Sequence, residues 1–301
     1  MAKRQNKSLR WQSLLKSTQL KVTMLKQRII TAISLLAILI PALFAKQPEW
    51  LMGVSLVLIV LACWEWGQLN GYTKKASWLM ALDGLVLCAL AWKFGLHMMK
   101  TPMLWLIVGS LWVLVAAWLI QRGVSRWQDV PRWLRVAGGL LALAAAWLAV
   151  AQAKAIGVNF LLSLLLMVWV ADIGAYFSGR RYGRRKLAPS ISPGKSWEGV
   201  YGGFAACMLL ALVWAHWQAP WMDSESLYQK LLQGRGWLLL ILSTALMVTL
   251  SVAGDLVESL VKRSAGMKDS SNLLPGHGGV LDRVDALLPT LPLGMMLYSL
   301  A

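Results

Sequence analysis

Charged residues are scarce in this sequence: Asp, Glu, Lys and Arg make up 14% of its 301 residues, against about 25% in a soluble domain. Cysteine is also rare, and Cys63, Cys88 and Cys207 each lie inside an apolar run. Three scattered thiols exclude a disulfide framework and a zinc site, and we interpret them as small apolar fillers. The apolar fraction of 58% excludes a disordered chain.

The sequence is instead rich in apolar runs close to the length that crosses a membrane. We predict nine transmembrane helices, near residues 29–45, 50–64, 76–92, 102–120, 133–151, 156–177, 200–217, 237–257 and 284–300. The expected fold class is an all-α, polytopic integral membrane protein. It divides into a basic N-terminal segment, residues 1–28, and a multi-helix membrane domain, residues 29–301.

Acidic residues are fewer than basic ones, 13 against 30, which gives a net charge of +17. The segments between the apolar runs alternately carry 24 and 6 of the Lys and Arg residues, with Arg135 counted in the segment it borders. Because positive residues stay on the cytoplasmic side during insertion, this alternation predicts a cytoplasmic N-terminus and an external C-terminus. The basicity is thus explained by topology, and we expect no nucleic-acid partner.

Two polar stretches, residues 178–199 and 258–283, both fall on the predicted cytoplasmic side. Asp255, Glu258, Ser259 and Lys262 lead into the second stretch at a spacing that places them on one face of a helix. Acidic side chains at membrane depth are costly and usually mark a functional site, although a salt-bridge ladder between helices would give the same pattern. Glu65, at the inner end of the second predicted helix, is interpreted as an interhelical partner.

The second polar stretch continues into the glycine-rich sequence PGHGG, residues 275–279. Glycine turns of this kind can point backbone N–H groups at phosphate oxygens. Asp282 and Asp285 follow on one helical face, and Asp255 and Asp269 lie earlier in the chain. Carboxylates of this kind are the hard oxygen ligands with which Mg²⁺ is bound beside a nucleotide.

Residues 259–285 resemble the signature of the phosphatidate cytidylyltransferases, also called CDP-diacylglycerol synthases. Its fixed positions are present here as Ser259, Lys262, Arg263, Lys268, Asp269, Pro275, His277, Gly278, Gly279, Asp282, Arg283 and Asp285. Residues 171–199 resemble a second conserved region of that family, through Asp172, Tyr176, Lys186, Pro189, Ser192, Pro193, Lys195, Glu198 and Gly199. The resemblance covers residues 24–301.

The resemblance implies that the phosphate of phosphatidic acid attacks the α-phosphorus of CTP, giving CDP-diacylglycerol and pyrophosphate at a site on the cytoplasmic face. Nucleotidyl transfer requires charge neutralisation and positioning more than a base. The metal ligands would be Asp255 and Asp282, and the catalytic residues Lys262, Arg263, Asp269, His277 and Asp285. Substrate binding would fall to Ser259, Lys268, Gly278, Gly279, Arg283, Asp172, Lys186, Ser192 and Lys195.

The expected cofactor is Mg²⁺, with a monovalent cation such as K⁺ as a possible second ion. The expected partners are CTP, phosphatidic acid, membrane lipids and a second copy of the chain, in a bacterial-type cytoplasmic membrane. Two alternatives remain open at this point. One is a CTP-dependent kinase of isoprenoid alcohols, and the other, less favoured because no internal repeat is visible, is a transporter of anionic lipids.

Overall fold

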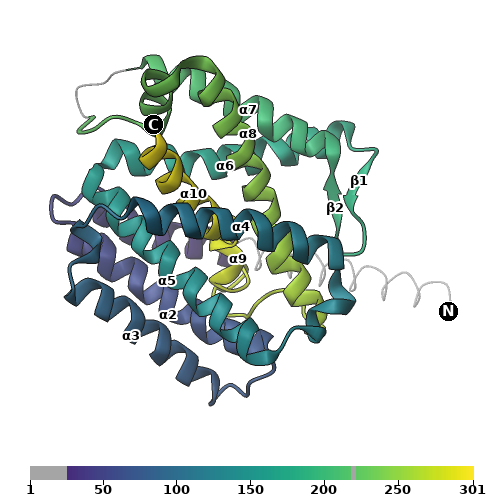
Figure 1. Ribbon diagram of the computed structural model, residues 1–301. Coiled ribbons are helices and arrows are strands. Elements are labelled where there is room, and N and C mark those ends of the chain that lie inside the picture. The colour runs from purple at the N-terminus through teal and green to yellow at the C-terminus, as the bar shows by residue number, and fades with distance from the viewer. Residues whose placement is uncertain (1–25, 218–221) are drawn as a thin grey trace, which may run out of the picture.

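The computed structural model describes residues 26–217 and 222–301, so nearly all of the basic segment 1–28 lies outside the described residues. The chain folds into a bundle of helices with one short hairpin (Figure 1). In chain order the elements are a first helix over Lys26–Phe44, α2 (Pro48–Leu69), α3 (Ser77–Lys93), η1 (Leu96–Met98), α4 (Pro102–Arg122), η2 (Val124–Asp129), α5 (Arg132–Ile156), α6 (Val158–Tyr182), β1 (Lys186–Ala188), β2 (Ser192–Ser196), α7 (Trp197–His216), α8 (Leu227–Ser264), α9 (Leu281–Val284) and α10 (Leu287–Leu300).

The predicted all-α membrane fold is confirmed, and each of the nine apolar runs coincides with a helix. Within the described residues, seven helices are long and apolar enough to cross a membrane. The other two, α3 with 17 residues and α10 with 14, are shorter. Nine crossings therefore stay a prediction, while a multi-pass membrane protein is what the structure shows.

The long helix α8 is broken near its start. Arg235 and Gly236 leave the helical conformation, and Gly236 has a φ of 73° that suits glycine. The part of α8 beyond this break corresponds to the predicted eighth run, which begins at residue 237. Ala301 lies against Gly234, just before the break, so the C-terminus is at the opposite end of α8 from Lys262 (Figure 1).

The centre of the bundle is filled by α10, whose residues 288–297 are all buried and which packs on α4, α5, α6 and α8. Helices α6 and α7 pack closely because glycines face each other. A Cβ at Gly174 would come within 2.8 Å of the Gly202 carbonyl oxygen, and one at Gly203 within 2.8 Å of the Ala171 carbonyl oxygen. Small residues that let backbones approach are a common device of membrane helix pairs.

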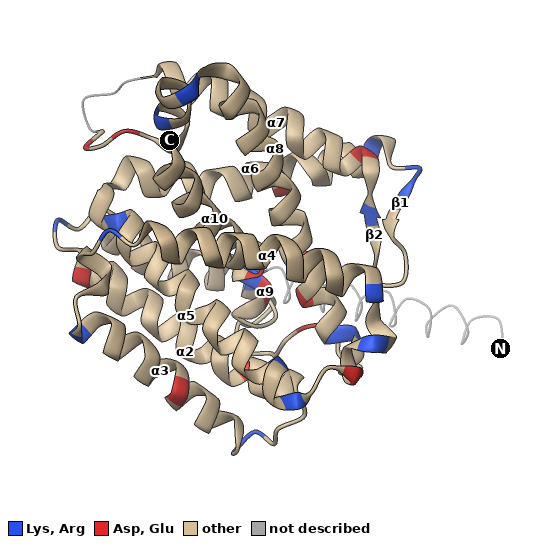
Figure 2. Cartoon of the chain, in the orientation of Figure 1, with Lys and Arg blue, Asp and Glu red and all other residues tan. Residues whose placement is uncertain are grey.

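Large apolar side chains cover the outside of the bundle, as a lipid-facing surface requires. Leu114, in the middle of α4, has 67% of its surface exposed. The three cysteines are buried and free, as predicted. Figure 2 shows charged residues mainly at helix ends and in connecting segments, with acidic and basic residues meeting near α9. This meeting point is where the candidate site lies.

Candidate active site

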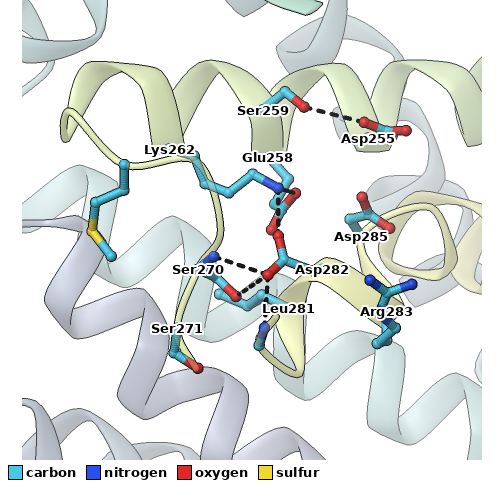
Figure 3. Close-up of polar contacts among 12 residues, drawn as sticks. Asp255, Glu258, Ser259, Lys262, Ser270, Ser271, Leu281, Asp282, Arg283 and Asp285 are labelled. Atoms are coloured by element: carbon cyan, nitrogen blue, oxygen red, sulfur yellow. Dashed lines mark hydrogen bonds and ion pairs between the residues drawn. The ribbon is translucent and has the colours of Figure 1, made fainter. Parts of the chain in front are cut away.

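The site forms where the last turns of α8 face α9 and the segment that joins them (Figure 3). The predicted polar stripe of α8 is present: the Ser259 hydroxyl donates to Asp255 Oδ1 at 3.2 Å, and Lys262 pairs with Glu258 one turn earlier. The stripe is directed at α9, because Lys262 Nζ also binds Asp282 Oδ1. Residues about 20 positions apart in the sequence thus share one cluster.

Lys262 is the central cation of this cluster. Its side chain is 11% exposed, and its two partners are still more buried, Glu258 at 4% and Asp282 at 7%. In such surroundings an ammonium group between two carboxylates neutralises charge that would otherwise be very costly to bury. Lys262 therefore has a structural role in addition to the phosphate contact predicted for it.

Asp282 accepts four hydrogen bonds. Besides Lys262 on Oδ1, its Oδ2 accepts the N–H groups of Ser270 at 2.9 Å and Gly279 at 2.8 Å, and the Ser270 hydroxyl at 3.0 Å. Burial alone would raise the pKa of Asp282, but these hydrogen bonds outweigh it and hold the pKa below its usual value. Each carboxylate oxygen has about two lone pairs, so Oδ2 is saturated, while Lys262 is the partner of Oδ1.

The hairpin β1–β2, which belongs to the first polar stretch, contacts α8 just before the second polar stretch begins. Lys195 on β2 forms an ion pair of 2.7 Å with Asp255 on α8. Asp172 on α6 interacts electrostatically with both of these residues. The structure thus brings together Asp172, Lys195 and Asp255, as the sequence predicted for one pocket. Lys186 is exposed on β1 and Ser192 is half-buried at the start of β2, so these two are placed on the hairpin and not in the cluster.

The glycine-rich turn is held differently from the phosphate cradle expected of it. The Gly279 N–H points inward to Asp282, and the next two N–H groups, of Val280 and Leu281, donate to Glu65. Gly278 has a φ of 83°, and a Cβ there would come within 2.6 Å of Asp282 Oδ2. The glycines therefore allow the turn to close on two carboxylates, which leaves these three N–H groups unavailable to a ligand.

Glu65 has partners in the turn that the sequence interpretation missed. As an interhelical partner it accepts the N–H groups of Val280 and Leu281 at the start of α9, but the interpretation needs a correction, because Glu65 also accepts the hydroxyls of Ser270 and Ser271 in the segment before the turn. The correction has a simple cause: the turn carries unpaired N–H and O–H donors that must be satisfied where it is buried. The sequence did contain a signal for a special role of Glu65: it is an acidic residue between two tryptophans at the end of an apolar run.

The remaining predicted residues lie around the cluster. Arg263, Lys268 and Asp269 are exposed, and Asp269 lies beside Gly278. Arg283 donates to the His277 carbonyl oxygen at 2.6 and 3.0 Å, which fastens the turn to α9. The His277 Nδ1 atom is buried and has no hydrogen-bond partner among the described residues. That these side chains contact the substrates stays a prediction.

The first helix covers the turn from another side. Arg28 Nε donates to the Gly276 carbonyl oxygen and the Thr31 hydroxyl to the Pro275 carbonyl oxygen, each at 3.0 Å. These contacts span more than 240 residues of sequence. The turn is therefore fixed by the first helix as well as by α2.

The carboxylates suit a magnesium ion that completes its shell with substrate. No three His, Cys, Asp or Glu side chains form a ready-made metal cage in the described part of the chain. Mg²⁺ needs none, because proteins hold it through one or two carboxylates and leave the other positions to water and phosphates. Asp255 and Asp285 interact electrostatically, and among the described residues Asp285 accepts only the Ala286 N–H, so both have lone pairs to spare.

Comparison with known proteins identifies a family and several relatives. Residues 26–301 match the cytidylyltransferase family. The chain is 39% identical over 276 residues to the phosphatidate cytidylyltransferase of Pseudomonas aeruginosa, covering 89% of this chain and 95% of the relative. It is 34% identical over 293 residues to that of Haemophilus influenzae, covering 91% and 99%, and 34% identical over 270 residues to that of Brucella suis, covering 88% and 89%.

The fold and the site define the class as a membrane-embedded nucleotidyltransferase. The chain belongs to the cytidylyltransferase family, as the resemblance in residues 171–199 and 259–285 predicted.

Proposed function

We propose that this enzyme joins CTP and phosphatidic acid to give CDP-diacylglycerol and pyrophosphate, in phospholipid biosynthesis. The observation that carries the proposal is the set of three ion pairs between three carboxylates, Asp255, Glu258 and Asp282, and two lysines, Lys195 and Lys262, which come from both family regions and lie at the end of α8. Relatives named for this activity match along nearly their whole length. Phosphatidic acid reaches the site from the bilayer and CTP from the adjoining aqueous phase.

In the reaction, a phosphate oxygen of phosphatidic acid forms a bond to the α-phosphorus of CTP. The bond from that phosphorus to the β-phosphate bridging oxygen breaks, and pyrophosphate leaves with the electron pair. The nucleophile is already ionised, so the protein must above all bring two polyanions together. Lys195 and Lys262 are placed to do so, since each can exchange its carboxylate partner for a phosphate oxygen.

We propose Mg²⁺ as the cofactor, held by Asp255 and by Asp282 when Lys262 moves to phosphate, with Asp285 as a further ligand. When bound, the ion supplies positive charge that polarises the α-phosphoryl group and stabilises the pyrophosphate leaving group. A monovalent cation as second ion and a homodimer are further proposals, which rest on the family resemblance.

The proposed reaction predicts where label from CTP appears. With CTP labelled at the α-phosphate, phosphatidic acid and Mg²⁺, purified enzyme is expected to place label in chloroform-extractable lipid and to release pyrophosphate. A lipid-alcohol kinase would instead leave α-label in CDP and transfer only γ-label. Label that stays in water-soluble CDP would contradict the proposed function, and omission of phosphatidic acid is the control that should stop both products.

We also propose that the protein lies in a bacterial-type cytoplasmic membrane with the N-terminus inside and the C-terminus outside. The support is the 24 to 6 division of Lys and Arg between alternate segments, together with Ala301 lying at the far end of α8 from the site. An alkaline phosphatase fused after Ala301 is therefore expected to be active, and a green fluorescent protein fused there dark. A fluorescent, phosphatase-inactive C-terminus would show that the number of crossings is even.

A further inference from the structure

Glu65 is a fully buried carboxylate in the middle of an apolar sequence. It lies near the end of α2, is 0% exposed, and takes part in none of the three ion pairs of the described residues. A carboxylate in such a place must be compensated by hydrogen bonds, because its burial is otherwise very costly. The groups that donate these hydrogen bonds therefore indicate which segment Glu65 holds in place.

Among the described residues, all of its hydrogen-bond donors come from one segment, residues 270–281. Oε1 accepts the Ser271 hydroxyl at 2.5 Å and the Val280 N–H at 2.9 Å, and Oε2 accepts the Leu281 N–H at 2.7 Å, while the Ser270 hydroxyl lies 3.1 Å away. The carboxylate is thus bound from both ends of the glycine-rich turn. One carboxylate on α2 sets the path of a segment more than 200 residues later in the chain.

The same contacts connect Glu65 to Asp282. The Ser270 hydroxyl lies 3.1 Å from Glu65 Oε2 and 3.0 Å from Asp282 Oδ2. Gly279, which donates its N–H to Asp282, packs on Glu65 so tightly that a Cβ would come within 2.4 Å of Oε1. The groups that orient Asp282 therefore rest directly on Glu65.

We propose that Glu65 is a positioning residue for the reaction proposed above: it holds the turn over residues 278–282 in the shape that aims Asp282 at Lys262 and the proposed metal. The proposal rests on the proposed function. Helix α2 contributes no other group to the cluster. Through Glu65, α2 supports the acidic side of the cluster. An apolar residue of the same volume would pack as well but could not accept from N–H and O–H donors on two sides.

The test variant is Glu65→Gln, which keeps the volume and replaces one oxygen by an NH₂ group that must face a backbone N–H or a serine hydroxyl. In hydrogen–deuterium exchange of the detergent-solubilised full chain, peptides covering residues 274–284 are expected to exchange faster, with α5 and α7 unchanged. In the cytidylyltransferase assay, the Mg²⁺ concentration for half-maximal turnover is expected to rise about 10- to 100-fold, the usual effect of losing a residue that orients a ligand.

Two further variants sharpen the result. Ser270→Ala breaks only the link between Glu65 and Asp282, so it is expected to raise the Mg²⁺ requirement by less than Glu65→Gln and to leave exchange at Val280 and Leu281 unchanged. This variant also keeps the test valid if Glu65→Gln does not fold. Glu49→Gln, an exposed site at the other end of α2, is the matched control and should change neither measurement.

Unchanged exchange over residues 274–284 in Glu65→Gln would overturn the proposal. So would faster exchange throughout the protein, which would make Glu65 a general stability residue. Faster exchange of the turn with an unaltered Mg²⁺ requirement would show that the turn does not position the site. The exchange measurement needs no substrate, so its outcome stands even if the enzyme proves to catalyse a different reaction.

Discussion

Asp255→Asn and Asp282→Asn are each expected to lower cytidylyltransferase turnover by about 100-fold or more, since a bound metal supplies several kcal/mol of charge stabilisation in the transition state. Asparagine keeps the size of the side chain and one oxygen, so both proteins should fold. The loss of negative charge weakens the metal site, and excess Mg²⁺ should therefore restore part of the activity. Turnover measured over a range of Mg²⁺ concentrations checks this directly.

Lys262→Ala provides the contrast in the same experiment. It removes a phosphate contact and keeps every carboxylate, but it also breaks the buried ion pair with Glu258, so turnover is measured per folded protein. Added Mg²⁺ is not expected to restore that turnover. Near-normal turnover in both Asp→Asn proteins would show that the metal is held elsewhere. Asp285, with its unused lone pairs, and Asp269 would then be the primary candidates.

The sequence predicted the α8 side of the site well because the signal was local. Asp255, Glu258, Ser259 and Lys262 are spaced by the helical repeat, so any helix through them must place them on one face. The structure confirms this with the Ser259–Asp255 and Lys262–Glu258 contacts. Spacing could not show that Lys262 also crosses to Asp282, because that depends on how the segment between α8 and α9 folds back.

The partners of Glu65 could not be predicted from the sequence for a related reason. More than 200 residues separate it from Ser270, and nothing in either local sequence specifies the other. The rule that an acid in a membrane helix pairs with a neighbouring helix holds for the Leu281 N–H at the start of α9, but it does not predict the serine hydroxyls of the preceding segment. The partners of Glu65 are determined by the N–H and O–H donors of the buried turn that need an acceptor. Which donors these are is a property of the folded chain.

The glycines show a similar limit. PGHGG predicted a turn, and the turn is present, with positive φ at Gly276 and Gly278. The direction of its N–H groups was not determined by composition. In the structure the nearby carboxylates of Asp282 and Glu65 accept those donors, which is why we propose Lys195 and Lys262 as the phosphate contacts instead.

The second large effect concerns stability as well as activity. Lys262→Met is expected to inactivate the enzyme and to destabilise it by about 3–5 kcal/mol, because breaking a buried ion pair leaves its partner uncompensated. Here the partner is Glu258, at 4% exposure beside Asp282. Thermal unfolding in detergent should show a clear fall in Tm relative to wild type. Lys100→Met, at an exposed lysine before α4, is the matched control and should unfold like wild type.

The double variant Lys262→Met/Glu258→Gln separates the two roles of the lysine. Removing the Glu258 charge takes away the uncompensated group, while Asp282 keeps its hydrogen bonds from Ser270 and Gly279. Most of the lost Tm should therefore return, which a double-mutant cycle records as a strong coupling between residues 258 and 262. Activity should stay lost, because the Lys262 ammonium group is missing and Lys195 alone is left to meet the phosphates. A double variant as unstable as Lys262→Met would show that the ion pair does not account for the stability, and an active one would remove Lys262 from the reaction.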